Sequence, residues 1–405
     1  MTEKFEVDVL IAGGGLVGGT LACGLAQGGL RVAVVDVLDP LEGLETAFDG
    51  RASAIALSSV RVLNGLGLWA VMEPQASAIK EIRVCDQDSP FFLHYDRKDV
   101  GADAFGYMVE NRDIRKALAG RFKDHKNLQL LAPDHISSLE RNPGDVCATL
   151  QSGRTIKARL IVGAEGRRSP TRDHAGIKTT GWPYRQTGIV CTVVHELPHY
   201  NVACECFFPG GPFAILPLAN NRSSIVWAEN DMLASGFMGL SDDAFLTELK
   251  NRFGDFLGEI ALIGPRWAYP LSLQYAASAS DHRLALVGDA SHAMHPIAGQ
   301  GLNMGLRDVA VLVEGLVDAR RLGLDPGDGT VLRSYERRRR LDNTLMLATT
   351  DGLNRLFSNN VEPVRLIRDL GLAAVNNMPP LKKVFMEHAM GLVGDLPRLM
   401  RSEKL

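Results

Sequence analysis

The sequence has no excess of charge of either sign and no targeting segment. Its 44 lysines and arginines nearly balance 47 aspartates and glutamates, so a net charge of −3 gives no support for nucleic-acid binding. The segment from Met1 to Val9 has no basic stretch leading into an apolar one, which a secretory signal requires. We therefore expect a cytoplasmic protein with no nucleic-acid partner.

Cysteine is scarce, and no two cysteines have the spacing of a zinc or redox motif. The six cysteines are spread over the chain without a C-x-x-C pair, so we expect neither a disulfide framework nor a metal site. Cys204 and Cys206 flank Glu205 in a strand-like segment and share one face, where we interpret both as small core residues. Internal repeats and low-complexity segments are absent as well.

No charged residue lies between Val9 and Leu30, which raises the alternative of a membrane-spanning helix. Eight glycines in this stretch argue against it, because glycine is a poor helix former. The stretch instead has the parts of a βαβ dinucleotide-binding unit in order, with a G-x-G-x-x-G loop between two buried strands. The strands are expected at Asp8–Ala12 and Leu30–Val35.

Three positions of this loop each require glycine for a different physical reason. Gly13 allows the tight turn, Gly15 lets a pyrophosphate meet the helix N-terminus, and Gly18 lets the helix pack closely on the strand. Asp36 ends the second strand, where an acid can accept hydrogen bonds from a ribose. The sequence therefore predicts a dinucleotide site at the N-terminus.

A second stretch, from Gly288 to Asp308, indicates which dinucleotide is bound. An apolar strand pattern delivers Asp289 to a loop, and a helical pattern follows the loop. The loop carries Gly299 and Gly301, so backbone N–H groups can approach a flat or charged ligand where a Cβ would collide. The sequence therefore predicts a second contact region for the same ligand.

These motifs resemble those of one known family. The chain is similar to the ubiquinone-biosynthesis flavin hydroxylases over nearly its whole length. They are a branch of the class A flavin monooxygenases that resembles p-hydroxybenzoate hydroxylase. The resemblance is carried by GGGLVGG, GRASAIALSSVRVLNGLGLW, GYMVENRDIRKAL, GPFAILPL, HPIAGQGLNMGLRD and SYERRRRLDN. GPFAILPL and HPIAGQGLNMGLRD are far more specific than the first, which many NAD and FAD proteins share.

The resemblance implies an α/β fold in which an FAD-binding Rossmann-like domain is interleaved with an antiparallel-sheet substrate domain, followed by a helical C-terminus. The FAD-binding domain would take residues 1–180, with an insertion near 75–105, and residues 281–330. The β-rich substrate domain would take residues 181–280, where short strand patterns are separated by Pro, Gly and Asn. Residues 331–405 would form the helical region.

The resemblance also assigns residues to FAD. Gly13, Gly15 and Gly18 would hold the pyrophosphate, and Asp36 would bind the adenosine ribose. Arg51 would reach the phosphate or ribityl region of FAD, with a solvated surface arginine as the alternative.

Further FAD contacts are implied in the middle and the second half of the chain. Arg112 is a candidate at a place where the family varies. Asp289 would hydrogen-bond the ribityl chain. The backbone from Gly299 through Gly301 and Leu302 to Asn303 would face the pyrimidine edge of the flavin, where a helix N-terminus favours negative charge.

One motif departs from the family pattern. The family reads G-A-D-G-x-x-S where this chain has Glu165 in place of the aspartate. In relatives this segment is linked to both FAD and NAD(P)H, and Arg167 and Arg168 are candidates for the phosphates of a reductant or are simply solvated. No second G-x-G-x-x-G unit is present, so NAD(P)H is expected to bind only transiently.

The implied reaction is a hydroxylation in which reduced FAD and dioxygen form a C4a-hydroperoxide that attacks an electron-rich ring carbon. His295, in the predicted flavin loop, is the nearest titratable candidate for handling the phenol proton. A histidine that only fixes the loop is the alternative. His292 is a weaker candidate.

The implied substrate is a prenylated phenol or quinol of ubiquinone biosynthesis. Phe213, Ile215 and Leu218 are expected to line its pocket, although a sheet core would use the same residues. The ring position does not follow from these motifs, because relatives acting at different positions share them.

Basic and apolar residues alternate at Val364–Arg368 and Leu381–Phe385, which suits peripheral contact with the inner face of a membrane. Packing on the chain's own core, on a second copy or in a quinone-biosynthesis complex is the alternative.

Two other functions stay open at this point. One is a flavin oxidoreductase that acts on an isoprenoid or aromatic substrate without inserting oxygen. The other is a non-catalytic flavoprotein that organises a quinone-biosynthesis complex.

Overall fold

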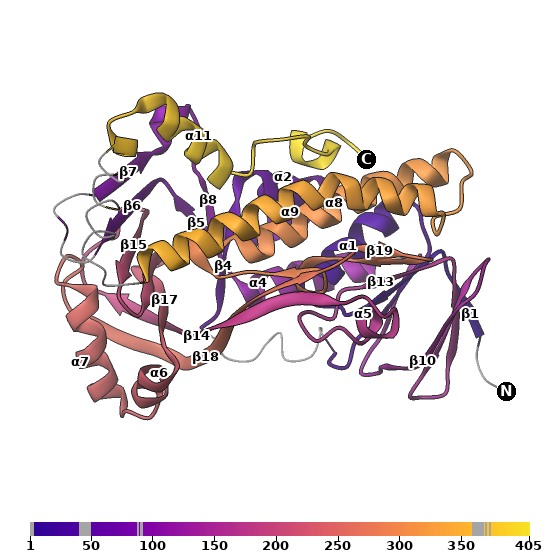
Figure 1. Cartoon of the computed structure of the whole chain (residues 1–405), viewed down its shortest axis with the longest axis horizontal. Helices are drawn as coiled ribbons and strands as arrows, with labels where there is room; N and C mark the ends of the chain where they lie inside the picture. Colours follow the sequence, from indigo (N-terminus) through magenta and orange to yellow (C-terminus); the bar gives the residue numbers. More distant parts are fainter. Residues whose placement is uncertain are drawn as a thin grey trace.

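The computed structural model describes residues 4–39, 50–86, 89, 92–358, 368, 371 and 374–405, without the side chain of Ala298. The two large sheets lie one after the other along an elongated molecule, and helices α8 and α9 run side by side along it (Figure 1). Helix α8 spans Gln300–Arg321 and α9 spans Gly329–Phe357.

The first large sheet has six strands in the order β19-β20-β13-β2-β3-β9. Apart from the antiparallel pair β19 and β20, neighbouring strands are parallel, and their apolar residues are buried on both faces. The bounds are Val9–Ala12 for β2, Val32–Val35 for β3, Leu128–Leu131 for β9, Leu160–Gly163 for β13, Ser280–Asp281 for β19 and Leu284–Leu286 for β20. Because these strands come from distant segments, the expected interleaved α/β fold is confirmed.

Helix α1 (Leu16–Gln27) packs between this sheet and α8. Close approach depends on glycine, because a Cβ on Gly24 would lie 2.9 Å from the Val313 side chain. Helix α4 (Asn111–Asp124) packs on the same apolar core. The core therefore sits between the parallel sheet and its covering helices.

The second large sheet has eight strands in the order β21-β18-β14-β17-β16-β15-β6-β7. Its two longest strands, β14 (Thr179–His195) and β18 (Ile260–Ala276), have 17 residues each. The others are β6 (Glu81–Asp86), β7 (Phe92–Asp96), β15 (Val202–Phe208), β16 (Gly211–Leu218), β17 (Arg222–Asn230) and β21 (His292–Ala293). Strands β6 and β7 join this sheet, although they precede it in sequence by about a hundred residues.

The two faces of this sheet have different environments. Helices α6 (Asp231–Met238) and α7 (Asp242–Phe253) contribute to the apolar cluster on one face. Phe213 and Ile215 belong to this cluster, so the expectation that they line a substrate pocket is wrong. Side chains alternate along β16, and Leu218 therefore points to the opposite face, on which Phe207 of β15 packs with Ile297.

Two smaller sheets complete the described strands. One orders β4 (Ala52–Ala56), β8 (Gly106–Glu110) and β5 (Ser77–Ile79), and the other orders β1 (Lys4–Glu6), β12 (Thr155–Ala158), β11 (Val146–Leu150) and β10 (Ile136–Arg141). The remaining short helices include α2 (Leu57–Gly65), α3 (Trp69–Met72) and α5 (Pro170–His174).

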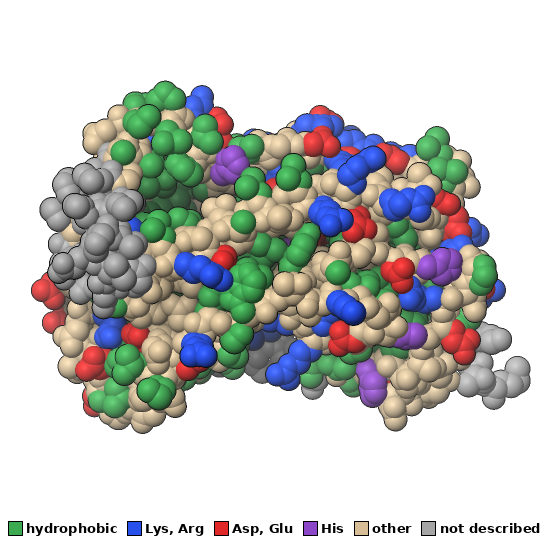
Figure 2. Space-filling model, viewed as in Figure 1, with side chains coloured by type: hydrophobic (Ala, Val, Ile, Leu, Met, Phe, Trp, Pro, Cys, Tyr) green, Lys and Arg blue, Asp and Glu red, His purple; other side chains and the backbone are tan. Residues whose placement is uncertain are grey.

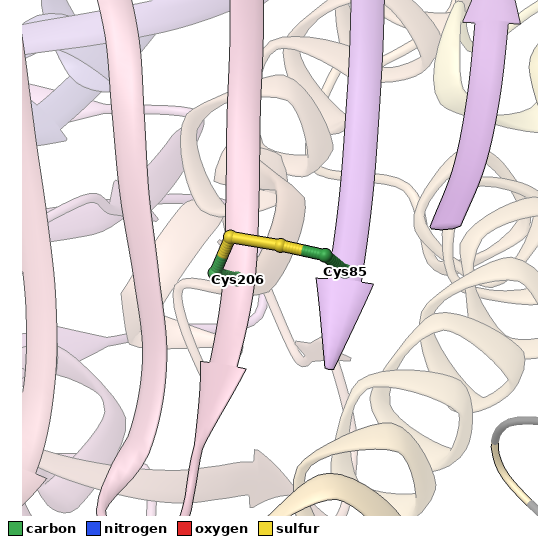
Figure 3. The surroundings of a disulfide bond; sticks show 2 residues. All are labelled: Cys85 and Cys206. Atoms are coloured by element: carbon green, nitrogen blue, oxygen red, sulfur yellow. A yellow bond between two sulfur atoms is a disulfide. The ribbon is translucent and has the colours of Figure 1, made fainter. Parts of the chain in front are cut away.

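Cys85 and Cys206 form a disulfide between the neighbouring strands β6 and β15 (Figure 3). The two residues are paired in register, with Cα atoms 4.7 Å apart. The interpretation of Cys206 as a small core residue is therefore wrong. Spacing along the chain did not indicate this pair, because 121 residues separate its members and only the parallel pairing of β6 with β15 brings them together.

The C-terminal part contains α9, α11 (Pro379–Ala389) and a short 3-10 helix at Arg398–Arg401 that packs on α2 and α8. The predicted segment Val364–Arg368 lies outside the described residues, except for Arg368 itself. Among the described helices, none combines the length and the apolar character needed to cross a membrane.

Candidate functional site

The glycine loop after β2 leaves open space at the start of helix α1. Gly13 has a φ of 98°, and a Cβ there would lie 2.5 Å from the Ala164 carbonyl oxygen. A Cβ on Gly18 would lie 2.0 Å from the Gly13 carbonyl oxygen. Around Gly15, by contrast, no atom lies within 4 Å of an added Cβ. Backbone N–H groups at this helix N-terminus therefore face a space that suits a phosphate.

Asp36 lies beside this loop, as the sequence predicts for an acid that binds a ribose. Its Oδ2 accepts a hydrogen bond from the Gly14 N–H at 2.5 Å, and its Oδ1 accepts one from the Leu38 N–H at 2.9 Å. Asp36, Gly13 and Gly15 line one cavity of 1030 Å³. Ligand pockets commonly measure about 300–1,000 Å³, so this cavity has room for the adenosine and pyrophosphate of a dinucleotide.

Glu165 lines the same cavity, but its carboxylate is used locally. It accepts hydrogen bonds from the Ser169 hydroxyl at 2.6 Å, from the Thr171 N–H at 3.1 Å and from the Thr171 hydroxyl. Burial raises its pKa. The Glu165 side chain, which is longer than the aspartate of the family motif, thus reaches the start of α5. Arg168 also lines the cavity, and its side chain is exposed.

The second predicted contact region is built on a buried charge cluster that sequence reasoning missed. Asp308, which is fully buried, accepts hydrogen bonds from the Gly288 N–H at 2.9 Å and from the Arg339 Nε at 2.6 Å. The His292 Nε2 lies 2.7 Å from the same carboxylate. Burial alone would raise the pKa of Asp308, but His292 and Arg339 lower it to about 2. The four consecutive arginines of SYERRRRLDN could have indicated this cluster in the sequence, because a buried carboxylate needs a cationic partner.

Asp289, beside this cluster, has a side chain that is 44% exposed. The Arg167 Nε lies 3.4 Å from its carboxylate, and the Arg167 guanidinium also donates to the Ser272 hydroxyl at 3.0 Å. Arg167 is therefore held by the protein itself. The Asp289 carboxylate is accessible for a ribityl hydroxyl, and that contact stays a prediction.

The flavin loop runs from His295 to Asn303 and leads into α8. Gly299 has a φ of 61° at the helix N-cap. The Asn303 side chain accepts a hydrogen bond from the Ala56 N–H at 2.8 Å and donates one to the Ala54 carbonyl at 2.9 Å. Strand β4 therefore fixes the loop through the Asn303 side chain.

The other predicted loop residues lie where the helix begins. A Cβ on Gly301 would meet no atom within 4 Å, and Leu302 packs against the core between α1 and α8. The N-terminus of the 22-residue helix α8 supplies a positive field at this place. Such a field suits the negative charge of a reduced flavin, and the backbone contacts of Gly299, Gly301, Leu302 and Asn303 with FAD stay predictions.

His295 is the first residue of the flavin loop, and its side chain is fully buried. Its ring and the Tyr184 ring meet edge to face with centroids 5.1 Å apart, and neither His295 nitrogen has a hydrogen-bond partner in the described structure. Burial and the charge of Arg167 lower the His295 pKa to about 4, against an opposing effect of Asp351. The imidazole is thus neutral at pH 7 and closed off in this conformation.

Arg51 and Arg112 have partners within the protein. The Arg51 guanidinium lies 4.9 Å from the centroid of the Trp267 ring. The Arg112 Nε and the Arg222 Nη1 each lie 2.9 Å from a different oxygen of the buried Glu110. Sequence reasoning missed Glu110, which directly precedes α4. Contact of either predicted arginine with FAD stays a prediction.

Comparisons with known proteins agree with this geometry. Residues 6–350 match the family described as FAD binding domain. The chain is 53% identical over 401 residues to the ubiquinone hydroxylase UbiL of Rhodospirillum rubrum, a match that covers 98% of this chain and 93% of that protein. It is 34% identical over 394 residues to the 3-demethoxyubiquinol 3-hydroxylase of Escherichia coli, with 97% and 100% covered.

A solved structure shows the same fold at lower sequence identity. The p-nitrophenol 4-monooxygenase PnpA from Pseudomonas putida DLL-E4 superposes with a TM-score of 0.80 at 18% identity, covering 97% of this chain and 99% of that chain. The glycine cradle, the dinucleotide-sized cavity and the fixed flavin loop all fit FAD. The chain therefore belongs to the FAD-dependent aromatic hydroxylases of ubiquinone biosynthesis, a branch of the class A flavin monooxygenases.

Proposed function

We propose that this enzyme hydroxylates the aromatic ring of a prenylated phenol or quinol on the path to ubiquinone. The observation that carries the proposal is the flavin loop, which Asn303 fixes to β4 and whose Ile297 packs against the apolar face of the eight-stranded sheet. The names of the relatives from Rhodospirillum rubrum and Escherichia coli support the substrate class.

FAD supplies the activation of dioxygen when it is bound, and the protein holds and shields the reactants. The N-terminus of α1, at Gly15, would hold the pyrophosphate, Asp36 would hold the adenosine ribose, and Asp289 would hold the ribityl chain. The start of α8 stabilises negative charge on the pyrimidine edge. Apolar residues around Ile297 exclude water from the reacting face.

The electron donor in this proposal is NAD(P)H, bound transiently at the FAD cavity. Arg168 is exposed at this cavity and suits the phosphates of a nicotinamide dinucleotide. Arg167, which Asp289 and Ser272 hold, is less suited to that role. Anaerobic mixing of the FAD-loaded protein with NADH or NADPH tests the donor, since bleaching of the flavin band reports reduction directly.

Labelled dioxygen tests the reaction. The wild-type holoenzyme, supplied with ¹⁸O₂, NAD(P)H and 2-prenylphenol, is expected to release a product that carries one ¹⁸O atom on the ring. Substrate oxidation without label would support an oxidoreductase. Full FAD loading with no NAD(P)H oxidation and no product for any prenylphenol would support a non-catalytic flavoprotein. Mass spectrometry of the quinone intermediates that accumulate without this chain would name the ring position.

A further inference from the structure

One apolar cluster supports the flavin loop on the face of the eight-stranded sheet that is remote from α6 and α7. This Ile297 cluster consists of Leu93, Phe207, Ile297 and Phe357. Ile297 belongs to the loop itself, and the rings of Phe207 and Phe357 stack with centroids 4.1 Å apart. The loop is therefore supported by β7, β15 and α9 together.

The disulfide between Cys85 and Cys206 lies on the other face of the same strands (Figure 3). Side chains alternate along β15, so Cys206 and its neighbour Phe207 point to opposite faces, and Phe207 points into the Ile297 cluster. Val84, the neighbour of Cys85 on β6, packs against the same cluster. Each half-cystine is thus one residue away from a side chain that supports the flavin loop.

The disulfide also holds the hairpin of β6 and β7 in place. Strand β7 lies at the edge of the sheet, and its Leu93 is paired with Val84 of β6. Strand β6 pairs in turn with β15, and the disulfide adds a covalent bond to this pairing. Opening the disulfide would therefore leave only noncovalent contacts between the hairpin and β15.

The residue after Cys85 connects β6 to the end of α9. The buried Asp86 carboxylate lies 2.7 Å from the Arg368 Nη2. The Arg368 guanidinium also donates to the carbonyl oxygens of the last two residues of α9, at 3.0 and 3.1 Å. The last of these is Phe357, a member of the Ile297 cluster. A shift of β6 at Cys85 would therefore reach the flavin loop through α9 as well.

The position of the pair suits a redox reaction. Cys85 and Cys206 are only half-buried, so small oxidants and reductants can approach this edge of the sheet. In the reducing cytoplasm that the sequence predicts, disulfides are usually transient and respond to an oxidant. Electron balance names an oxidant, because dioxygen that takes two electrons from NAD(P)H and is not inserted into a ring leaves as hydrogen peroxide.

We propose that Cys85 and Cys206 are a redox-active pair that controls how tightly the flavin loop couples NAD(P)H consumption to hydroxylation. Hydrogen peroxide converts one thiol to a sulfenic acid and releases water, and the second thiol displaces another water as the disulfide closes. A dithiol reopens the pair by thiol–disulfide exchange and is itself oxidised to a disulfide. This inference rests on the proposed function.

The two forms of the pair differ in the support that they give to the flavin loop. In the dithiol form the hairpin moves more freely against β15, the Ile297 cluster loosens, and more hydrogen peroxide is released per NAD(P)H. In the disulfide form the cluster is held firmly and less is released. Peroxide from a loosened loop therefore restores the form that releases less of it.

The first test asks whether the pair changes its redox state in the folded holoenzyme. The FAD-loaded wild type is treated with dithiothreitol, desalted and divided, and one part is then treated with hydrogen peroxide. Alkylation in denaturant, followed by mass spectrometry, is expected to label Cys85 and Cys206 in the reduced part and neither in the part treated with peroxide. Equal labelling of both residues in the two parts would overturn the pair as a peroxide-responsive site.

The second test measures coupling in the two desalted forms of the wild type, and it needs no variant that could misfold. With NAD(P)H and 2-prenylphenol, the reduced form is expected to release severalfold more hydrogen peroxide per NAD(P)H than the oxidised form. Cys206→Ser should behave like the reduced form in either treatment. Cys204→Ser is the matched control, because Cys204 lies on the same face of β15 outside the disulfide, and it should respond like the wild type.

Equal peroxide release from the reduced and oxidised wild type would overturn control of the flavin loop by the pair. If neither form oxidises NAD(P)H, the proposed function fails, and the fluorescence of the bound FAD then tests the pair by itself. Emission that differs between the two forms would support a connection from the pair to the flavin loop, and identical emission would overturn it.

Discussion

One carboxylate, Asp308, holds together three segments that are distant in sequence. It accepts a hydrogen bond from the backbone after β20, contacts His292 before the flavin loop, and pairs with Arg339 on α9. Removing one partner of a buried ion pair leaves the other charge uncompensated. The position of the flavin loop thus depends on a residue that need not touch FAD.

Asp308→Asn should lower the free energy of unfolding by up to about 3 kcal/mol, because the buried Arg339 then keeps only Asp342 as a carboxylate partner. In the wild type, the folded pKa of Asp308 is about 2, below the ordinary value of 3.8. Its contribution of about 2 kcal/mol is therefore present above pH 4 and is lost as the pH falls towards 2. Urea unfolding between pH 2 and 6 measures both effects, and an Asp308→Asn protein with wild-type stability would contradict the role of the cluster.

His295 has its own pH window. Its folded pKa is about 4, below the ordinary value of 6.5, so the unfolded chain binds a proton first as the pH falls. Stability should therefore decrease by roughly 3 kcal/mol between pH 6.5 and pH 4, and His295→Gln should remove most of that dependence. Unfolding curves across this range provide the measurement.

The proton role of His295 is a separate prediction. If the histidine handles the phenol proton, His295→Gln should change the pH dependence of coupled hydroxylation, with more hydrogen peroxide released per NAD(P)H consumed. Coupled turnover that stays normal across pH in this variant would leave His295 with a purely structural role in the loop. Its full burial and its contact with Tyr184 mean that the loop must shift before a substrate reaches it.

At the scale of elements, α11 presents the apolar residues Leu381, Val384 and Phe385, which are 36%, 47% and 45% exposed. Figure 2 shows hydrophobic side chains gathered in this part of the surface, at the upper left. Lys383 lies among them with its side chain 58% exposed. Such a helix suits the surface of an anionic membrane, where prenylated substrates reside.

Flotation with phosphatidylglycerol-containing vesicles checks this prediction. The wild type is expected to float with the vesicles, and replacing Val384 and Phe385 by serine should reduce the bound fraction severalfold. Leu341→Ser, which removes an exposed leucine from α9, is the control and should float like the wild type. Binding that is equal in all three proteins, or absent in the wild type, would exclude α11 as a membrane contact.

Local sequence patterns predicted the helices and strands well, but they did not predict contacts between elements that are distant in sequence. The glycine spacing and the acid at Asp36 predicted the first site because they are local requirements of one βαβ unit. The choice of Phe213 and Ile215 as pocket residues failed because alternation along a strand separates two faces without saying which one helices cover. The Cys85–Cys206 disulfide and the Asp308 cluster depend on pairing across the fold.

At the scale of the whole molecule, strands β14 and β18 of the eight-stranded sheet pair over most of their length and extend toward the parallel sheet (Figure 1). The buried Glu110, next to α4, also pairs with Arg222 of β17, so charge links the two parts as well. Cooperative unfolding is therefore expected. Scanning calorimetry should show one transition for the whole molecule, and FAD should raise the Tm of this single transition. Two separate transitions, of which FAD shifts only one, would show that the sheets unfold independently.

The interleaved strand order also determines when the parallel sheet can be completed during synthesis of the chain. Strand β20 lies beside β13 in the parallel sheet, yet the ribosome makes it only after strands β14 to β18 of the eight-stranded sheet have been synthesised. The nucleotide site thus stays incomplete, without β20, while the ribosome adds more than a hundred residues after β13. FAD should be captured late, once α8 has emerged, and a chain truncated before Leu284 is expected to bind none.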